Sequence, residues 1–244
     1  SGIFIPYVGA VYDLNDQYSV YASYSTIFKP QSAQDPNGKT LDPLEGENFE
    51  AGIKGEFFDG RLNASLAYYQ LKQDNFAKEI PNVLTPSGGV ASEALQGVKT
   101  KGAELEVTGE IRPGWNLHAG FNHKISKQDG IKQSTLTPEN EFSLYTSYKL
   151  NQWVEGLTIG GGARWQDKTW GDVTNPLYKD PVKHVVSDYW LFDAMANYEV
   201  NDQLSVSFNV NNLLDEKYYT IFSWYSTYTW GEGRNYNLGL KYKF

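Results

Sequence analysis

Apolar and polar residues alternate one by one along most of this chain. In the last ten residues, Tyr236, Leu238, Leu240, Tyr242 and Phe244 fall on one side, and every residue between them is polar or glycine. Successive side chains of a β-strand point to opposite faces, so this pattern predicts a strand with one apolar and one polar face. A helix would mix the two sets of residues. The last strand of a soluble β-sandwich would alternate in the same way, so this segment leaves both fold classes open.

The alternation recurs in eleven segments of the chain, which predicts an all-β, antiparallel fold. Residues that favour turns lie between the segments, among them Asp59-Gly60 and Pro113-Gly114. The predicted strands span 3–14, 18–28, 49–57, 62–68, 103–111, 117–121, 142–150, 157–165, 190–200, 204–210 and 235–244.

Short turns and long connections alternate strictly between these strands. The long connections, at 29–46, after about 72, and at 124–138, 166–187 and 217–233, contain few alternating residues and are predicted to be irregular loops. Short turns on one rim and long loops on the other are typical of transmembrane β-barrels, whereas a sandwich has no reason to alternate them.

The number of predicted strands bears on how much of a barrel the chain contains. Single-chain bacterial barrels close with an even number of strands, and eleven is half of 22, the size of the plugged outer-membrane transporters. We therefore expect residues 1–244 to form the C-terminal half of a 22-stranded barrel domain, with no plug domain in this chain. No signal peptide is visible, which predicts a processed chain or part of a longer one.

Composition supports a strand-based membrane protein and excludes several other classes. No run approaches the roughly 20 apolar residues of a membrane helix, while 18 Tyr and 7 Trp could supply the aromatic girdles of a barrel. The net charge of −8 argues against a nucleic-acid partner. The absence of Cys removes disulfides and thiolate metal sites from consideration.

Four segments, in order along the chain, resemble the TonB-dependent siderophore receptors, in particular their ferripyoverdine and hydroxamate-siderophore branch. Residues 18–31 are similar to an early barrel hairpin of that family, and 47–55 to its "E-x-G-x-K" strand. Residues 101–106 match "K-G-x-E-x-E", and 209–219 match the "N-L-F-D-K-x-Y-Y" box. The family usually has Pro where this chain has Gly233, so we expect a less rigid loop base there.

The resemblance implies active import of a ferric siderophore across the outer membrane of a Gram-negative bacterium. Its implied partners are outer-membrane lipid, the ferric siderophore, and TonB with ExbB and ExbD, which act through a plug. Iron would arrive with the siderophore, so no resident cofactor is expected. The alternatives are a passive outer-membrane pore and a surface adhesin or phage-receptor barrel, and a missing plug in the full gene product would favour the pore.

Charged residues on the polar faces of two predicted strands are expected to point into the barrel lumen. They either pair with plug residues or solvate the wall. Neighbouring Glu on one strand face is common in a lumen, so we expect no catalytic residue and no enzyme. The residues are Glu50, Lys54, Glu56, Glu104, Glu106 and Glu110.

Aromatic residues of the last long loops are the candidate ligand contacts, because rigid rings with polar handles suit capture of a large, partly aromatic ligand. The alternative role for these residues is the interface girdle. Tyr225 stands where the ferripyoverdine receptors carry a ligand-contacting Tyr. The three His match no metal or catalytic spacing, so no metal site is expected. The candidates are Trp170, Tyr178, Trp224, Tyr225, Tyr228 and Trp230.

Overall fold

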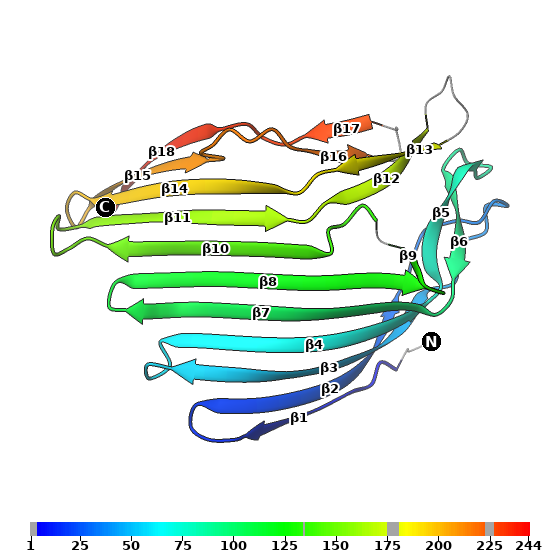
Figure 1. The fold of residues 1–244 in the computed structure, drawn as a ribbon, viewed down its shortest axis with the longest axis horizontal. Helices are drawn as coiled ribbons and strands as arrows, with labels where there is room; N and C mark the ends of the chain where they lie inside the picture. Colours follow the sequence, from blue (N-terminus) through cyan, green and yellow to red (C-terminus); the bar gives the residue numbers. More distant parts are fainter. Residues whose placement is uncertain (1–3, 134, 175–180, 223–226) are drawn as a thin grey trace. The chain divides into compact units, whose positions relative to one another are not determined.

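A computed structural model describes residues 4–133, 135–174, 181–222 and 227–244 of the chain. Its principal sheet has twelve strands, and eleven of them follow one another in a continuous path, the number that the alternation predicts (Figure 1). They are β1 (Tyr7–Asp13), β2 (Tyr18–Lys29), β3 (Leu44–Phe57), β4 (Leu62–Asp74), β7 (Val98–Arg112), β8 (Trp115–Gln128), β10 (Asn140–Lys149), β11 (Leu157–Gln166), β14 (Tyr189–Glu199), β15 (Leu204–Asn211) and β18 (Asn235–Tyr242).

Each of these strands is hydrogen-bonded to the one before it along the chain, and a two-residue strand, β9 (Ile131–Lys132), joins the sheet beside β8. The register is antiparallel, for example between β10 and β11, β14 and β15, and β15 and β18. Over the described residues every element is a strand, and no helix is long and apolar enough to cross a membrane.

Three of the long connections are more regular than the sequence pattern predicted. They contain two-stranded hairpins: β5 (Phe76–Leu84) with β6 (Val90–Leu95), β12 (Thr169–Thr174) with β13 (Pro181–Val186), and β16 (Tyr219–Phe222) with β17 (Thr227–Trp230). The prediction of irregular loops was wrong there because these strands are short and imperfect. In β5–β6 the register shifts between Glu79 and Leu84, beside Pro81, which cannot donate to a ladder.

By its internal contacts the chain divides into two compact units. Unit 1 comprises residues 1–54, 66–103 and 124–134, and its buried core includes Ala91, Leu95 and Val98. The β5–β6 hairpin packs there on the segment before β3, where the Ser92 amide donates to the Gln34 carbonyl at 2.7 Å. Unit 2 comprises residues 55–65, 104–123 and 135–244, and its buried apolar side chains are Val186, Leu191 and Val210.

The short turns have the chemistry that their residues predict. The side-chain oxygen of Asn15 accepts hydrogen bonds from the amides of Gln17 and Tyr18 at 2.8 and 2.9 Å, and Asn201 makes the equivalent pair at 2.9 Å each. Such Asn side chains mimic a backbone turn. At the turn after β3, Gly60 has a φ of 81°, a conformation that glycine adopts without strain.

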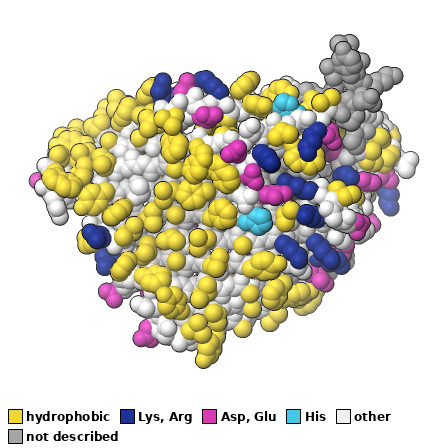
Figure 2. Space-filling model, in the orientation of Figure 1, with side chains coloured by type: hydrophobic (Ala, Val, Ile, Leu, Met, Phe, Trp, Pro, Cys, Tyr) yellow, Lys and Arg dark blue, Asp and Glu magenta, His cyan; other side chains and the backbone are white. Residues whose placement is uncertain are grey.

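The sheet has the predicted division into two faces. In the β15–β18 pair, Tyr236, Leu238 and Leu240 oppose Val210, Phe208 and Val206, so apolar residues share one face. Leu238 and Leu240 are 71% and 72% exposed. Figure 2 shows hydrophobic side chains covering one face of strands such as β10 and β11. A soluble monomer rarely exposes so large an apolar surface, whereas a lipid-facing wall must.

Candidate functional site

The hairpins β12–β13 and β16–β17 carry the aromatic residues that the sequence singled out, and both belong to unit 2. The β12–β13 hairpin is fixed at its base by the Trp170 amide, which donates to the Thr135 carbonyl at 3.0 Å. Gly171 allows close packing there, since a Cβ atom at this position would lie 2.7 Å from the Leu136 side chain. The hairpin is therefore held in a defined position beside the end of β11.

The β16–β17 hairpin gathers three aromatic rings on one face. Tyr219 pairs with Trp230, and Ile221 with Tyr228, so alternation brings the Tyr219, Tyr228 and Trp230 rings together. The Tyr219 ring centroid lies 5.2 Å from that of Tyr228 and 5.1 Å from that of Trp230, both in edge-to-face geometry. Tyr228 is 40% and Trp230 65% exposed, so this cluster keeps open aromatic surface.

His184 of β13 lies between two of these tyrosines. Its Nε2 is 3.0 Å from the Tyr219 hydroxyl, and its Nδ1 is 3.5 Å from the Tyr228 hydroxyl. The imidazole centroid is 4.9 Å from that of the Tyr228 ring. His184 thus joins the two hairpins, a role that sequence reasoning missed because it searched the histidines only for metal and catalytic spacing.

Trp170 points from the opposite face of its hairpin. Gly171 pairs with His184 and Trp170 with Val185, so alternation separates Trp170 from His184. The ammonium of Lys183 lies 3.9 Å from the centre of the Trp170 ring, a cation–π contact. Of the six candidate ligand contacts, the structure brings together Tyr228 and Trp230 and places Trp170 elsewhere. The other three, Tyr178, Trp224 and Tyr225, lie outside the described residues.

The family-like box at 209–219 closes the base of the β16–β17 loop through one buried side chain, Asn212. Its amide donates to the carbonyls of Glu216 at 2.9 Å and Glu232 at 3.1 Å, one on each side of the loop. Its side-chain oxygen accepts from the Glu216 amide at 2.8 Å. Asn212 has a φ of 51°, and Asn tolerates this left-handed region better than most residues. The motif therefore fixes where the aromatic hairpin begins and ends.

Asp215, in the same box, holds the chain beside Gly233. Its Oδ1 accepts from the Arg234 amide at 2.9 Å, and its Oδ2 accepts from the Lys217 ammonium at 2.9 Å. The Arg234 backbone hydrogen bond, followed by the Lys217 side chain, holds the pKa of Asp215 below its ordinary value. Hydrogen bonds to a carboxylate favour its charged form. The loop base is thus tied to this carboxylate next to the glycine that replaces the family's proline.

The polar face of the sheet contains the six charged residues that were expected to face the lumen. The Tyr21 hydroxyl donates to Glu50 at 2.7 Å, and the Lys54 ammonium lies 5.0 Å from the centre of the Tyr21 ring. Glu110 lies 3.6 Å from the Arg61 guanidinium. Glu56, Glu104 and Glu106 are exposed, and within the described ranges none of the three forms an ion pair.

A second polar network lies further along the same face, on strands where the sequence suggested no site. Asp193 of β14, whose side chain is 8% exposed, accepts hydrogen bonds from the Tyr145 hydroxyl and the Arg164 guanidinium at 3.0 Å each. It also accepts from the Asn212 amide at 2.9 Å, which connects the network to the loop base. The sequence did contain a signal for this network, because Arg164 and Asp193 occupy polar positions in strands whose apolar and polar residues alternate.

Beside this network the wall is hollowed into a cavity of about 530 Å³. Glycine lets the Tyr145 ring lie against this part of the wall, because a Cβ at Gly162 would be 2.7 Å from that ring. Among the described residues, no three His, Asp or Glu side chains are grouped so that they could hold a metal ion. The cavity is lined by His118, Tyr145, Asp193, Met195, Asn209 and Asn211, among others.

Comparison with known proteins identifies the family. Residues 1–213 match the family model described as "TonB dependent receptor-like, beta-barrel". The chain belongs to the TonB-dependent receptor family. This result confirms the predicted fold class and excludes the soluble sandwich that the last strand alone left open.

Named relatives cover the whole chain. It is 49% identical over 250 residues to the ferripyoverdine receptor of Pseudomonas aeruginosa, which covers 100% of this chain and 31% of the relative. It is 42% identical over 246 residues to the ferric-pyoverdine 358 receptor of Pseudomonas putida, with 100% and 29% covered. The chain thus spans about a third of the length of these curated receptors.

Solved receptors have the same arrangement of strands. The P. aeruginosa ferripyoverdine receptor of the outer membrane, in its crystal structure bound to ferripyoverdine, superposes with a TM-score of 0.89 at 48% identity, covering 100% of this chain and 33% of that one. The siderophore receptor PiuA from Acinetobacter baumannii gives a TM-score of 0.74 at 26% identity, with 98% and 35% covered.

Proposed function

We propose that this chain is the C-terminal part of an outer-membrane receptor barrel that imports a ferric siderophore, of the pyoverdine class, by TonB-dependent transport. The observation that carries the proposal is the 49% identity to a ferripyoverdine receptor over the whole chain. In this proposal residues 1–244 supply half of a 22-stranded barrel, and the other half and the plug belong to the rest of the receptor. Iron is cargo, carried by the siderophore, and the protein is not an enzyme.

The aromatic hairpins support the capture of such a ligand. Trp230 and Tyr228 offer exposed rings on a face that His184 and Tyr219 hold in place. Stacking on these rings and hydrogen bonds from the phenols would bind a chromophore-bearing siderophore with little loss of side-chain entropy. Tyr225 and Trp224, in the same loop, and Tyr178 and Trp170 in the neighbouring one, remain proposed contacts.

The polar face supports a plug-facing role for the wall. Glu104 and Glu106 are exposed charges without ion pairs in the described part of the chain, so they are available to plug cations. Glu50, Lys54 and Glu110 already contact Tyr21 or Arg61 of this wall, and they would present pre-organised partners. TonB, energised by ExbB and ExbD, would act on the plug rather than on this chain.

The experiment uses the complete receptor in a strain that lacks its own siderophore receptors. Uptake of radioactive iron as ferripyoverdine should be abolished by a protonophore, which separates active import from a passive pore. Tyr228→Ala with Trp230→Ala should weaken equilibrium binding by about 10- to 100-fold, the loss expected for one or two aromatic anchors. Uptake that persists in the presence of the protonophore would contradict the proposal.

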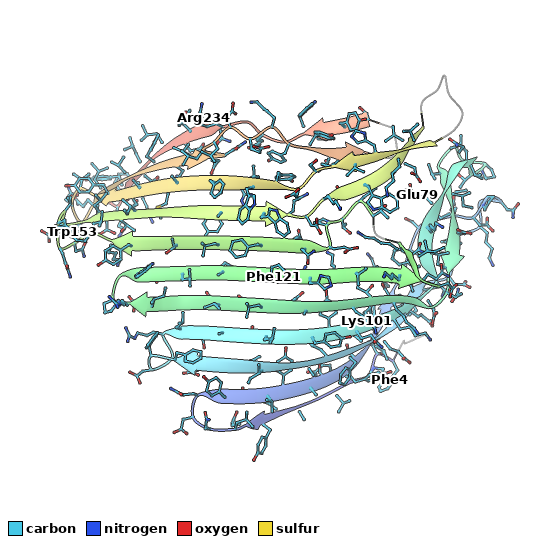
Figure 3. All side chains as sticks on the ribbon, in the orientation of Figure 1. Phe4, Glu79, Lys101, Phe121, Trp153 and Arg234 are labelled. Carbon is cyan, nitrogen blue, oxygen red and sulfur yellow. The ribbon has the colours of Figure 1, made fainter. Side chains whose placement is uncertain are left out.

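Trp153 provides the matched control. It is 70% exposed but lies on the turn between β10 and β11, away from the β12–β13 and β16–β17 hairpins (Figure 3). Trp153→Ala should leave the ferripyoverdine dissociation constant unchanged. Equal loss of affinity from Trp153→Ala and from the hairpin variant would show that the hairpin loss reflects general destabilisation, and the assignment of the hairpin to the ligand would fail.

A further inference from the structure

The carboxylate of Asp193, on β14, uses its two oxygens for two different regions of unit 2. Its Oδ2 accepts hydrogen bonds from the Tyr145 hydroxyl and the Arg164 guanidinium, at 3.0 Å each. Its Oδ1 accepts from the Asn212 backbone amide at 2.9 Å. The Asp193 side chain is 8% exposed, whereas that of Arg164 is 47% exposed. One oxygen is therefore bound within the wall, and the other holds the first residue after β15.

The backbone beside Asp193 reinforces this contact with Asn212. The Leu213 amide donates to the Phe192 carbonyl at 2.6 Å. Asn212 has a φ of 51°, a left-handed conformation that few residues other than glycine adopt. Such a conformation persists only where the surrounding structure determines it. Phe192 and Asp193 thus hold two successive amides of the box at 209–219, and they fix the direction in which the chain leaves β15.

From Asn212 the constraint reaches both ends of the β16–β17 loop. The Asn212 side chain donates to one carbonyl on each side of this loop, and the Gly231 amide donates to the Tyr218 carbonyl at 2.9 Å. Gly231 packs closely on the Tyr218 ring, because a Cβ atom at this position would overlap that ring. The next pair along the hairpin is Tyr219 with Trp230. A displacement of Asn212 would therefore be passed directly to the aromatic cluster.

Only a carboxylate satisfies the groups around this position. An ionised Asp accepts hydrogen bonds at both oxygens, so it can bind Tyr145, Arg164 and Asn212 at once. An Asn of the same size has one oxygen and one NH₂ group. The guanidinium would take the oxygen, because hydrogen bonds to charged groups are the stronger ones. The NH₂ group would then face the Asn212 amide, donor against donor.

We propose that Asp193 is a positioning residue for siderophore capture, because its carboxylate sets the Asn212 backbone and thereby the position of the aromatic cluster. The cluster comprises Tyr219, Tyr228 and Trp230. This inference rests on the proposed function, in which these rings contact the ferric siderophore. Asp193 acts through Asn212, since its own carboxylate is buried in the wall. A hairpin that must be ordered during binding loses part of its binding free energy, whereas a hairpin that is already ordered does not.

The test measures ferripyoverdine binding to the complete receptor in detergent by titration of tryptophan fluorescence. Asp193→Asn should weaken equilibrium binding about tenfold, or about 1.4 kcal/mol, the scale of one hydrogen bond to a charged group. Residues 216–222 and 227–233 should also show faster amide exchange, while the β15–β18 ladder stays protected. An unchanged dissociation constant for Asp193→Asn would overturn the proposal.

A second variant separates positioning from general damage to the wall. Arg164→Met and Tyr145→Phe, added to Asp193→Asn, remove the two donors that compete for the Asn oxygen. That oxygen can then turn back to the Asn212 amide. The triple variant should therefore bind ferripyoverdine about threefold more tightly than Asp193→Asn alone. A merely structural role predicts the opposite order, because each further substitution would add damage, and that order would overturn the proposal.

Glu199→Gln is the matched control, since it makes the same change from carboxylate to amide on the same strand. Glu199 is the last residue of β14, at the end away from the hairpins, and it is exposed. The variant should keep the wild-type affinity and the wild-type exchange of the hairpin. A loss of affinity equal to that of Asp193→Asn would overturn the assignment to Asp193.

Amide exchange keeps this inference distinguishable from the proposed cargo. If the wild type binds no ferripyoverdine, the proposed cargo is wrong, and exchange alone decides whether Asp193 positions the hairpin. Faster exchange in Asp193→Asn would then support the positioning role, and unchanged exchange would overturn it. If the wild type binds ferripyoverdine and Asp193→Asn binds it equally well, only the inference about Asp193 fails.

Discussion

The principal sheet and the β12–β13 and β16–β17 hairpins of this chain differ in how their residues are arranged. In the β15–β18 pair, apolar residues oppose apolar residues, and polar residues oppose polar residues or glycine, along the whole register. In β16–β17, one face contains Tyr219, Tyr228 and Trp230, and His184 of the β12–β13 hairpin contacts this face. Lipid on one side and a polar lumen on the other impose a strict period of two, whereas water around the hairpins imposes none.

The comparison teaches where stability comes from in each region. Strands of the sheet are stabilised by continuous hydrogen-bonded ladders, which is the condition for crossing a bilayer. The hairpins depend on a few specific contacts at their bases, namely Asn212, Asp215 and His184. Substitutions in the sheet should therefore be sensitive to which face they occupy. Substitutions in the hairpins should instead be sensitive to individual hydrogen bonds.

The largest effect is expected on the apolar face of the last strand. Leu238→Arg should lower the free energy of unfolding by roughly 2–4 kcal/mol, the cost of a cation near the middle of the bilayer. Asn237→Arg, one residue away on the polar face, should cost far less. Gly239 is a poor comparator, since a Cβ there would lie 2.5 Å from the Ser207 hydroxyl. Denaturant unfolding of the complete receptor in lipid vesicles measures both; equal destabilisation would refute the assignment of faces.

A smaller but still large effect is expected at the loop base. Asn212→Ala removes three hydrogen bonds from a buried side chain, which should cost about 2–3 kcal/mol at about 1 kcal/mol each. The loss should be local, appearing as faster amide exchange in residues 216–222 and 227–233 while the β15–β18 ladder stays protected. Asn201→Ala, which removes two bonds in an exposed turn, is the control. Unchanged exchange in the hairpin would contradict the clamp.

The joint between the two hairpins should contribute less. His184→Phe keeps a ring beside Tyr228 but removes both contacts to tyrosine hydroxyls. Because each is a partly exposed hydrogen bond, we expect a loss of about 1 kcal/mol, seen as increased exchange in β13 and β16 together. His118→Phe, on the polar face of β8 with only a 3.4 Å contact to Thr108, should leave these hairpins unaffected. If only β13 responds, the two hairpins are not coupled through His184.

The sequence pattern was sufficient to predict the sheet, because each strand has lipid on one face and a polar environment on the other. Leu157–Gln166, for example, carries Ile159 and Trp165 on one face and Arg164 on the other, so its type and faces could be predicted. The hairpins could not be predicted in this way. Their strands are four to nine residues long, and their residues pack on neighbouring loops rather than on lipid, which leaves no periodic signal.

The residue types of the aromatic cluster could be predicted from the sequence, but its geometry could not. The concentration of aromatics in the last loops pointed to Tyr228 and Trp230, and the structure brings these together. Trp170 lies on the hairpin face opposite His184, because Gly171 is the residue that pairs with His184. The pattern of a single segment does not reveal this pairing. Likewise, the Asp193 network needs the register of three strands and the position of Asn212. Contacts between distant segments are decided by pairing, and one strand's pattern does not encode its partner's register.

The smallest expected effect is a dependence of the loop base on acid. The pKa of Asp215 is held below its ordinary value by the Arg234 amide and then by Lys217. A carboxyl group whose folded-state pKa is lowered adds stability above its unfolded-state pKa, and this stability is lost as the pH falls through the folded-state pKa. Amide exchange of residues 231–235, corrected for its intrinsic pH dependence, should therefore be unchanged between pH 7 and 5. It should increase when the pH falls below about 4, the ordinary range of Asp.

The Asp215→Asn variant tests whether this carboxylate causes the acid-induced increase in amide exchange. The amide oxygen of Asn could still accept the Arg234 hydrogen bond, but it carries no charge and does not titrate. The variant should therefore show faster exchange at neutral pH and no further increase in acid that is specific to residues 231–235. The β18 ladder, whose hydrogen bonds involve no carboxylate, should stay protected in both proteins. An acid-induced increase of the same size in Asp215→Asn would assign the effect to another group and leave Asn212 as the clamp that closes this loop.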